Sequence, residues 1–192
     1  MSKNNIKAHI LGYPRIGAKR ELKFALESFW RKEAPSEHLQ DTAKTLRAEH
    51  WQKQQEAGLT FITSNDFSLY DHMLDHSVLF GAQPKRFNKK PFGEVNTSQE
   101  NSYFALARGN LEQPAMEMTK WFDTNYHYIV PELASDTQFS INVHDFLSQL
   151  DEAQKISKNV KPVLLGPVSF LYLSKARNIN KLELLDALAQ QY

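Results

Sequence analysis

Cysteine is absent from this chain of 192 residues, so no disulfide bond can form within it and no thiolate can bind a metal ion. An excess of one charge is absent too, because 23 lysines and arginines stand against 22 aspartates and glutamates. General binding to nucleic acid or to a membrane surface requires a basic excess that neutralises phosphates, so neither partner is expected.

Long apolar runs are also missing, since no stretch approaches the ~18 residues that cross a bilayer. The first ten residues, MSKNNIKAHI, lack the layout of a signal peptide, and we expect a cytoplasmic protein. What the chain does contain is 41% apolar residues, enough for a core, and an ordinary 23% of charged residues. Its length suits one domain or part of a larger one.

The spacing of apolar residues predicts strands that alternate with helices. We expect strands at residues 8–13, 59–66, 138–143 and 161–166, and helices at residues 22–30, 34–58, 69–81, around Lys120 before Pro131, at 145–156 and at 181–192. Ser36 and Gly58 are expected to cap and to end the second helix. Residues 82–102 are expected to form a long loop, and Leu182, Leu185 and Leu188 to share one helix face.

Alternation of this kind is typical of right-handed βαβ units around a parallel sheet. The expected strands are nearly continuous apolar runs, which fits a sheet that is covered on both faces. We count about four such units, whereas a complete (β/α)8 barrel takes about 250 residues. The fold predicted is therefore α/β, about half of a TIM-like (β/α)8 barrel.

The segment GYPRIGAKRELK follows the first expected strand and opens a helix. Lys19, Arg20 and Lys23 gather there, beside backbone amides that have no partner in the first turn of a helix. Cations are poorly placed at a helix N-terminus unless an anion binds, so the group could hold carboxylates or phosphates. A solvated helix start remains the alternative interpretation.

Two further segments have side chains that suit a ligand. Lys120 stands among Trp121, Phe122, Tyr126 and Tyr128, which could enclose a flat anionic ligand or could be an ordinary helix core with a lysine that reaches past its neighbours to water.

His72 and His76 are four residues apart, a spacing that places both on one helix face, with Asp71 and Asp75 near by. The metalloprotease pattern is not met and no third ligand is obvious, so a metal site at this pair is only a weak hypothesis.

Five stretches in sequence order resemble successive blocks of cobalamin-independent methionine synthase: LGYPRIGAKRELKFALESFW, HWQKQQEAGL, NDFSLYDHML, EMTKWFDTNYHYIVPEL and VKPVLLGPVSFLYL. The resemblance covers about residues 9–175. It implies two fused (β/α)8 barrels and transfer of a methyl group from 5-methyltetrahydrofolate polyglutamate to homocysteine, which gives methionine. It also implies a zinc ion, held by His, Cys and Glu ligands in the carboxy-terminal barrel, that turns the homocysteine thiol into a thiolate.

The resemblance further implies that the RELK block and the lysine of MTKWF bind the folate triglutamate. These positions are Arg20, Glu21, Leu22, Lys23 and Lys120. Glu21 fits an anionic tail least well, so we expect its backbone rather than its carboxylate to contribute. No catalytic residue and no metal ligand of the family is expected within these 192 residues.

On this interpretation residues 1–192 are an incomplete N-terminal barrel domain, and the catalytic C-terminal barrel is absent. We expect an N-terminal fragment that binds folate polyglutamate, has no bound zinc and does not act on homocysteine by itself. Because sheet edges are left open, we expect it either to be marginally stable or to associate with itself. The alternatives are a short non-catalytic paralogue that assembles with a separate partner chain, and a small metal hydrolase built on His72 and His76.

Overall fold

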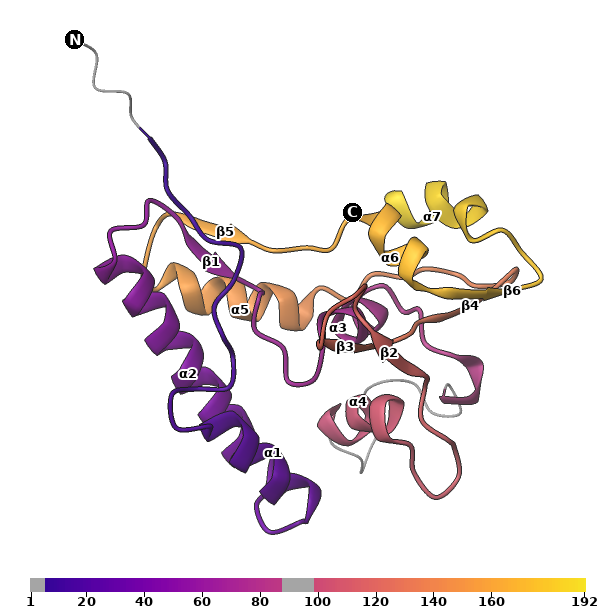
Figure 1. Cartoon of the computed structure of the whole chain (residues 1–192), viewed down its shortest axis with the longest axis horizontal. Coiled ribbons are helices and arrows are strands. Elements are labelled where there is room, and N and C mark those ends of the chain that lie inside the picture. The colour runs from indigo at the N-terminus through magenta and orange to yellow at the C-terminus, as the bar shows by residue number, and fades with distance from the viewer. Residues whose placement is uncertain (1–5, 88–98) are drawn as a thin grey trace. The chain divides into compact units, whose positions relative to one another are not determined.

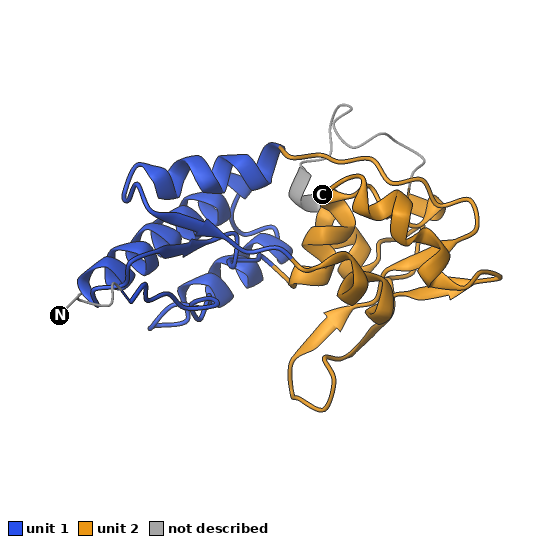
Figure 2. Cartoon of the chain, turned by 90° about the horizontal axis from the view of Figure 1, so that it is seen from above, with its two compact units in different colours: residues 1–69, 144–164 blue, residues 70–143, 165–192 orange. Residues whose placement is uncertain are grey.

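The structure is a computed structural model that describes residues 6–87 and 99–192. The chain divides into two compact units, coloured separately in Figure 2. Unit 1 comprises Met1–Leu69 and His144–Leu164, and unit 2 comprises Tyr70–Val143 and Leu165–Tyr192. Among the described residues, no helix is both long enough and apolar enough to span a bilayer.

Unit 1 pairs two short parallel strands and packs helices against them (Figure 1). Its elements are α1 (Glu21–Trp30), α2 (Ser36–Glu56), β1 (Ile62–Ser64), α5 (His144–Gln154) and β5 (Val160–Pro162). The helices predicted in these regions are confirmed. Gly58 has φ +76° and directly follows the C-cap of α2, as expected, but Ser36 is the first helical residue and not the N-cap.

The core of unit 1 forms where α2 and α5 meet the strand pair. Trp51 of α2, Ile62 of β1 and Ala153 of α5 are buried together, with Ile156 and Val160 packed against them. In the register of the pair, Ile62 lies opposite Val160. Apolar side chains from four elements thus surround the short strands, and this burial, more than three residues of ladder, stabilises them.

The strand predicted at residues 8–13 is wrong, although the segment does run beside β1. Its carbonyl oxygens accept hydrogen bonds from residues in and next to β1. The Thr60 N–H donates to the Ala8 oxygen at 2.8 Å, and the Thr63 hydroxyl donates to the Ile10 oxygen at 2.7 Å. The backbone N–H and carbonyl groups of Thr63 are already hydrogen-bonded to side chains of α2. Gln54 accepts its N–H at 2.7 Å and Trp51 donates to its carbonyl oxygen at 2.9 Å. No ladder can form there, because helix side chains occupy the strand edge.

Unit 2 contains two further strand pairs, one antiparallel and one parallel (Figure 1). Its elements are α3 (His72–Leu79), η1 (Lys85–Phe87), α4 (Gln99–Arg108), β2 (Met118–Lys120), β3 (His127–Ile129), β4 (Glu132–Ala134), α6 (Pro167–Leu173), β6 (Lys175–Arg177), η2 (Lys181–Leu184) and α7 (Leu185–Ala189). Strand β2 pairs with β3 antiparallel, and β4 pairs with β6 parallel.

The helix predicted around Lys120 is wrong, because the segment forms the β2–β3 hairpin. Trp121 donates its N–H to the Tyr126 carbonyl oxygen at 2.7 Å, and Lys120 lies opposite His127 in the ladder. At the other end, the buried Asp71 carboxylate accepts the Ile129 N–H at 3.0 Å. The richness of the segment in aromatic and β-branched residues, around a turn of Asp, Thr and Asn, was the signal for a hairpin.

Three other predictions in unit 2 need correction. Residues 138–143 are not a strand, because the Ser140 and Asn142 amides donate to carbonyl oxygens at the end of α3, at 3.0 and 2.7 Å. The expected loop at 82–102 contains η1 and the start of α4, and its residues 88–98 lie outside the described part. The last helix begins as the 3-10 turn η2, which leaves Leu182 exposed and buries Leu184 in its place, while Leu188 is buried as predicted.

The described residues therefore form a mixed α/β protein with three two-stranded sheets, two of them parallel, and no closed barrel. Helices between parallel strands agree with the class predicted from the sequence. The strands are shorter than predicted, three residues each, because side chains and irregular segments take many of the backbone bonds that longer ladders would use.

Candidate functional site

The loop before α1 is folded tightly onto the start of the helix. Gly17 and Arg20 both have left-handed backbone conformations, with φ +86° and +66°. The Arg20 N–H donates to the Gly17 carbonyl oxygen at 3.2 Å, and the Leu22 N–H donates to the Ile16 carbonyl oxygen at 3.1 Å. These bonds turn the chain sharply and place three cationic residues within one short loop and the first turn of the helix.

The N-terminus of α1 has free donors and no side-chain cap. The N-cap residue is Arg20, whose side chain cannot accept a hydrogen bond, and no capping bond forms there. Within the described residues, the amides of Glu21 and Lys23 have no hydrogen-bond partner. Unpaired amides and the positive end of the helix dipole both favour an anion at this place.

The side chains of this group differ in how they meet solvent. Lys19 and Arg20 are exposed, and across the described part of the chain neither side chain has a partner. The side chain of Lys23 is 43% exposed and pairs weakly with Glu27 across 3.6 Å. Leu22 is fully buried, so of the predicted RELK residues it contributes packing and not a surface contact. Arg20 and Lys23 remain available to a ligand.

Lys120 belongs to unit 2, whereas the other predicted site residues belong to unit 1, so each group is described in its own unit. Lys120 is exposed at the end of β2. The aromatic side chains expected around it do gather, with the Trp121 ring centroid 5.5, 6.3 and 5.7 Å from those of Phe122, Tyr126 and Tyr128. They surround a hairpin and not a helix. The exposed rings of Phe122 and Tyr126 leave apolar surface beside the cation.

The histidine pair does not form a metal site. Both ring nitrogens of His76 are used, since Nδ1 bonds to the His72 carbonyl oxygen at 2.8 Å and Nε2 lies 2.9 Å from the Leu165 N–H. Because Nε2 must accept that bond, the ring is the neutral tautomer with its proton on Nδ1. Burial lowers the pKa of His76 to about 4. In the part of the chain that the structure describes, no three His, Cys, Asp or Glu residues are grouped as metal ligands. The geometry of the described residues therefore gives no support to the metal-hydrolase alternative.

Two functional features of the loop escaped the sequence analysis. Gly17 has a left-handed backbone and leaves space for the Glu21 carboxylate, which an added Cβ would approach to 2.2 Å. That carboxylate accepts the Lys19 N–H at 2.9 Å. The glycine between an apolar run and a charged helix start was a visible signal for a left-handed turn. No local sequence pattern predicted the hydrogen bond from the Lys19 N–H to the Glu21 carboxylate, because this bond depends on how the loop folds.

Comparisons with known proteins agree with the resemblance. The family model described as "Cobalamin-independent synthase, N-terminal domain" matches residues 7–192. A protein of Paraburkholderia xenovorans named 5-methyltetrahydropteroyltriglutamate--homocysteine methyltransferase is 53% identical over 188 residues, and one of the same name from Catharanthus roseus is 50% identical over 190. These matches cover 97% and 96% of the chain but 24% of each relative.

Matches of this identity over nearly the whole chain include the loop, α1 and the β2–β3 hairpin. The chain spans about a quarter of the length of these relatives, so it corresponds to one portion of a longer architecture. The matching family model describes that portion as the N-terminal domain. The chain belongs to the cobalamin-independent synthase family, in which it matches the N-terminal domain.

Proposed function

We propose that this chain supplies the folate-polyglutamate-binding part of a cobalamin-independent methionine synthase. The whole enzyme would transfer the methyl group of 5-methyltetrahydrofolate polyglutamate to homocysteine. The printed names of the relatives, which specify a pteroyltriglutamate donor and a homocysteine acceptor, support this proposal. The role proposed for these 192 residues is to bind the tail of the donor and not to perform the chemistry.

The observation that carries the proposal is the cationic start of α1. Lys19 and Arg20 have exposed side chains, and within the described residues neither side chain has a partner. The backbone N–H groups of Glu21 and Lys23 donate no hydrogen bond to any described residue. A triglutamate tail carries several carboxylates, each of which can take a charge-assisted bond from a cation or an amide. We propose that Arg20, Lys23 and the amide of Glu21 bind carboxylates of the tail. Lys120, in unit 2, is proposed separately as a further folate-binding residue.

We further propose that residues 1–192 are about half of an N-terminal (β/α)8 barrel domain. The parallel pairs β1–β5 and β4–β6, each separated in sequence by helices, support this fold. In barrels of this type the loops after the strands carry the site. The cationic loop, which follows an extended segment bonded along β1, occupies a comparable place in the chain.

The zinc site that the family implies does not fit the residues of this chain. The sequence has no cysteine, and among the described residues no cluster of three ligands exists. We propose that the 192-residue chain alone does not transfer the methyl group. Purified chain, supplied with zinc, triglutamyl methylfolate and homocysteine, should give no methionine above the blank by mass spectrometry. Steady turnover would contradict this.

The binding role predicts that affinity rises with the number of glutamates. Titration calorimetry with mono- and triglutamyl 5-methyltetrahydrofolate should show tighter binding of the triglutamyl form, because each added carboxylate meets a cation or an amide. Raising the salt concentration should reduce the difference. Arg20→Ala and Lys23→Ala should each weaken triglutamyl binding about threefold to fivefold, the effect of one partly exposed ion pair of ~1 kcal/mol.

A matched control is Lys44→Ala, which removes an exposed lysine from α2 and should leave both affinities unchanged. Lys120→Ala tests the second group in the same titration. Equal affinity for the two folates, or equal losses in the Lys44 and Arg20 variants, would contradict the assignment of the site.

A further inference from the structure

Glu21 is the one acidic residue in the first turn of α1, at a site proposed to bind an anion. Its negative charge should repel a carboxylate tail if the side chain faces the ligand. The structure shows the side chain engaged elsewhere. Oε2 of Glu21 accepts the N–H of Lys19, two residues earlier, at 2.9 Å. The carboxylate therefore folds back onto the loop.

The space that the carboxylate occupies is left open by Gly17. A Cβ on Gly17 would lie 2.2 Å from Oε2 of Glu21 and 2.9 Å from Cδ2 of Leu46 on α2. Both distances are below those that Cβ atoms normally show, so a side chain at residue 17 would displace the Glu21 carboxylate from this place. The φ of +86° at Gly17 disfavours other residues for a second reason. Glu21 is thus packed against the loop at Gly17 and bonded to it at Lys19.

Arg20 lies between the two residues that this bond joins. It has φ +66°, a left-handed conformation that disfavours residues with a side chain and persists only where the surroundings hold it. Its own N–H donates to Gly17, and the bond from Glu21 to Lys19 closes a small ring around it. Loss of that ring would let Arg20 relax toward the right-handed region and would redirect its side chain.

From this geometry we infer that Glu21 is a positioning residue, whose carboxylate holds residues 17–20 in the conformation that presents Lys19 and Arg20 to the ligand. The inference rests on the proposed function for its ligand, a folate polyglutamate, and names the residue that shapes that site. The carboxylate itself does not contact the tail. What the bond needs is an acceptor oxygen at this reach and not a negative charge.

Three variants separate these roles. Glu21→Gln keeps an acceptor oxygen and removes the charge, and Glu21→Ala removes both. Glu27→Ala removes a carboxylate of the same helix that, among the described residues, pairs with Lys23 alone. Two quantities are measured on the intact chain. One is the rate at which the Lys19 amide exchanges with water in the ligand-free protein, by NMR, and the other is the affinity for triglutamyl methylfolate, by calorimetry.

The Glu21→Ala variant should exchange the Lys19 amide faster and bind the triglutamyl form about tenfold more weakly, the effect of one lost charge-assisted bond. The Glu21→Gln variant should restore both values to within about threefold of the wild type. Glu27→Ala should leave the exchange rate of Lys19 unchanged. Rescue by glutamine is the result that a general loss of structure would not produce, and equal melting temperatures of the variants would support it.

Two outcomes would overturn the inference. An unchanged exchange rate of Lys19 in Glu21→Ala would show that the bond does not hold the loop. Tighter binding in both Glu21 variants would show that the carboxylate faces the tail and repels it. Failure of the wild type to bind any triglutamyl folate would instead contradict the proposed function, and the exchange rates would still decide whether Glu21 holds the loop.

Discussion

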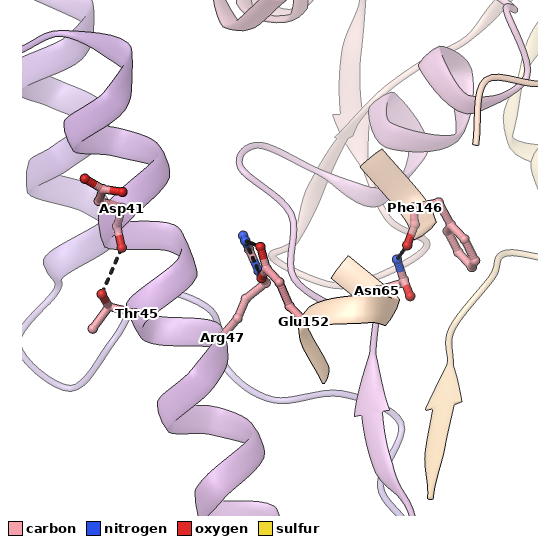
Figure 3. A network of polar contacts seen from close by, with 6 residues as sticks. All are labelled: Asp41, Thr45, Arg47, Asn65, Phe146 and Glu152. Carbon is pink, nitrogen blue, oxygen red and sulfur yellow. Dashed lines mark hydrogen bonds and ion pairs between the residues drawn. The ribbon is translucent and has the colours of Figure 1, made fainter. Parts of the chain in front are cut away.

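Arg47→Ala is expected to lower the free energy of unfolding by about 3–5 kcal/mol, the typical effect of leaving a buried charge without its partner. Arg47 of α2 bonds Glu152 of α5 through two nitrogens, Nε to Oε2 at 2.9 Å and Nη2 to Oε1 at 3.0 Å (Figure 3). The two side chains are 8% and 18% exposed. The guanidinium also lies 5.4 Å from the centre of the Phe67 ring. Alanine removes all of these contacts and leaves the Glu152 carboxylate in poorly hydrated surroundings.

Urea unfolding followed by circular dichroism measures this loss. The double variant Arg47→Met, Glu152→Leu replaces both charges with apolar groups of similar volume and should recover most of the stability, because neither side chain then needs solvation. Arg31→Ala is the exposed control, since its ion pair with Glu33 has side chains 59% and 54% exposed and should matter by less than about 1 kcal/mol. An equal loss in the Arg31 and Arg47 variants would refute the prediction.

The stability contributed by His76 is expected to disappear in mild acid. The neutral ring accepts the Leu165 N–H at 2.9 Å, and burial lowers the pKa of His76 to about 4 from an ordinary 6.5. Between these values the unfolded chain binds a proton that the folded chain does not, so stability is complete above pH 6.5 and falls as the pH falls toward 4. From pH 7 to pH 5 the loss should be about 2 kcal/mol, at 1.36 kcal/mol per pH unit.

Asp71 gives a dependence of opposite sign, since burial raises its pKa to about 7 and favours the protonated, folded form at lower pH. The quantity to measure is therefore the difference in the free energy of unfolding between two proteins that both contain Asp71. Urea unfolding of the wild type and of His76→Gln, which keeps one donor and one acceptor, is compared at pH 7, 6 and 5. Asp71 is present in both proteins and cancels. The advantage of the wild type should shrink by about 2 kcal/mol across this range. A constant advantage would contradict the lowered pKa of His76.

The helices predicted at residues 22–30, 34–58 and 145–156 were confirmed because their signal is local, whereas α4 and α6 were not predicted. The apolar spacing of Leu22 and Leu26 lies on one face of α1, and both residues are buried as that pattern requires. Gly58 and Gly81 end their helices with left-handed backbones, as their positions after the last periodic residue indicated. Parallel pairing as such was also predicted, from the alternation of strands and helices, but which strands pair, as β1 does with β5, was not.

Strands were predicted less well because their hydrogen bonds come from distant parts of the chain. Residues 8–13 have the composition of a strand, but Gln54 and Trp51 take the bonds of the neighbouring edge. Near Lys120, the spacing of the apolar residues favoured a helix, but the segment forms the β2–β3 hairpin, which the Asp71 carboxylate stabilises by accepting the Ile129 N–H. The spacing of apolar residues along the sequence does not show which distant group will hydrogen-bond a given backbone amide.

By itself, the sequence determined the family, the α/β class, the main helices, and the gathering of Lys19, Arg20 and Lys23 at a helix start, because these depend on residue order and on spacing within a few turns. Tertiary structure alone decided that both nitrogens of His76 are used and that Glu21 bonds backward to Lys19. The reason is that hydrogen bonds and burial are set by distances in space, which the fold creates and the order of residues does not display.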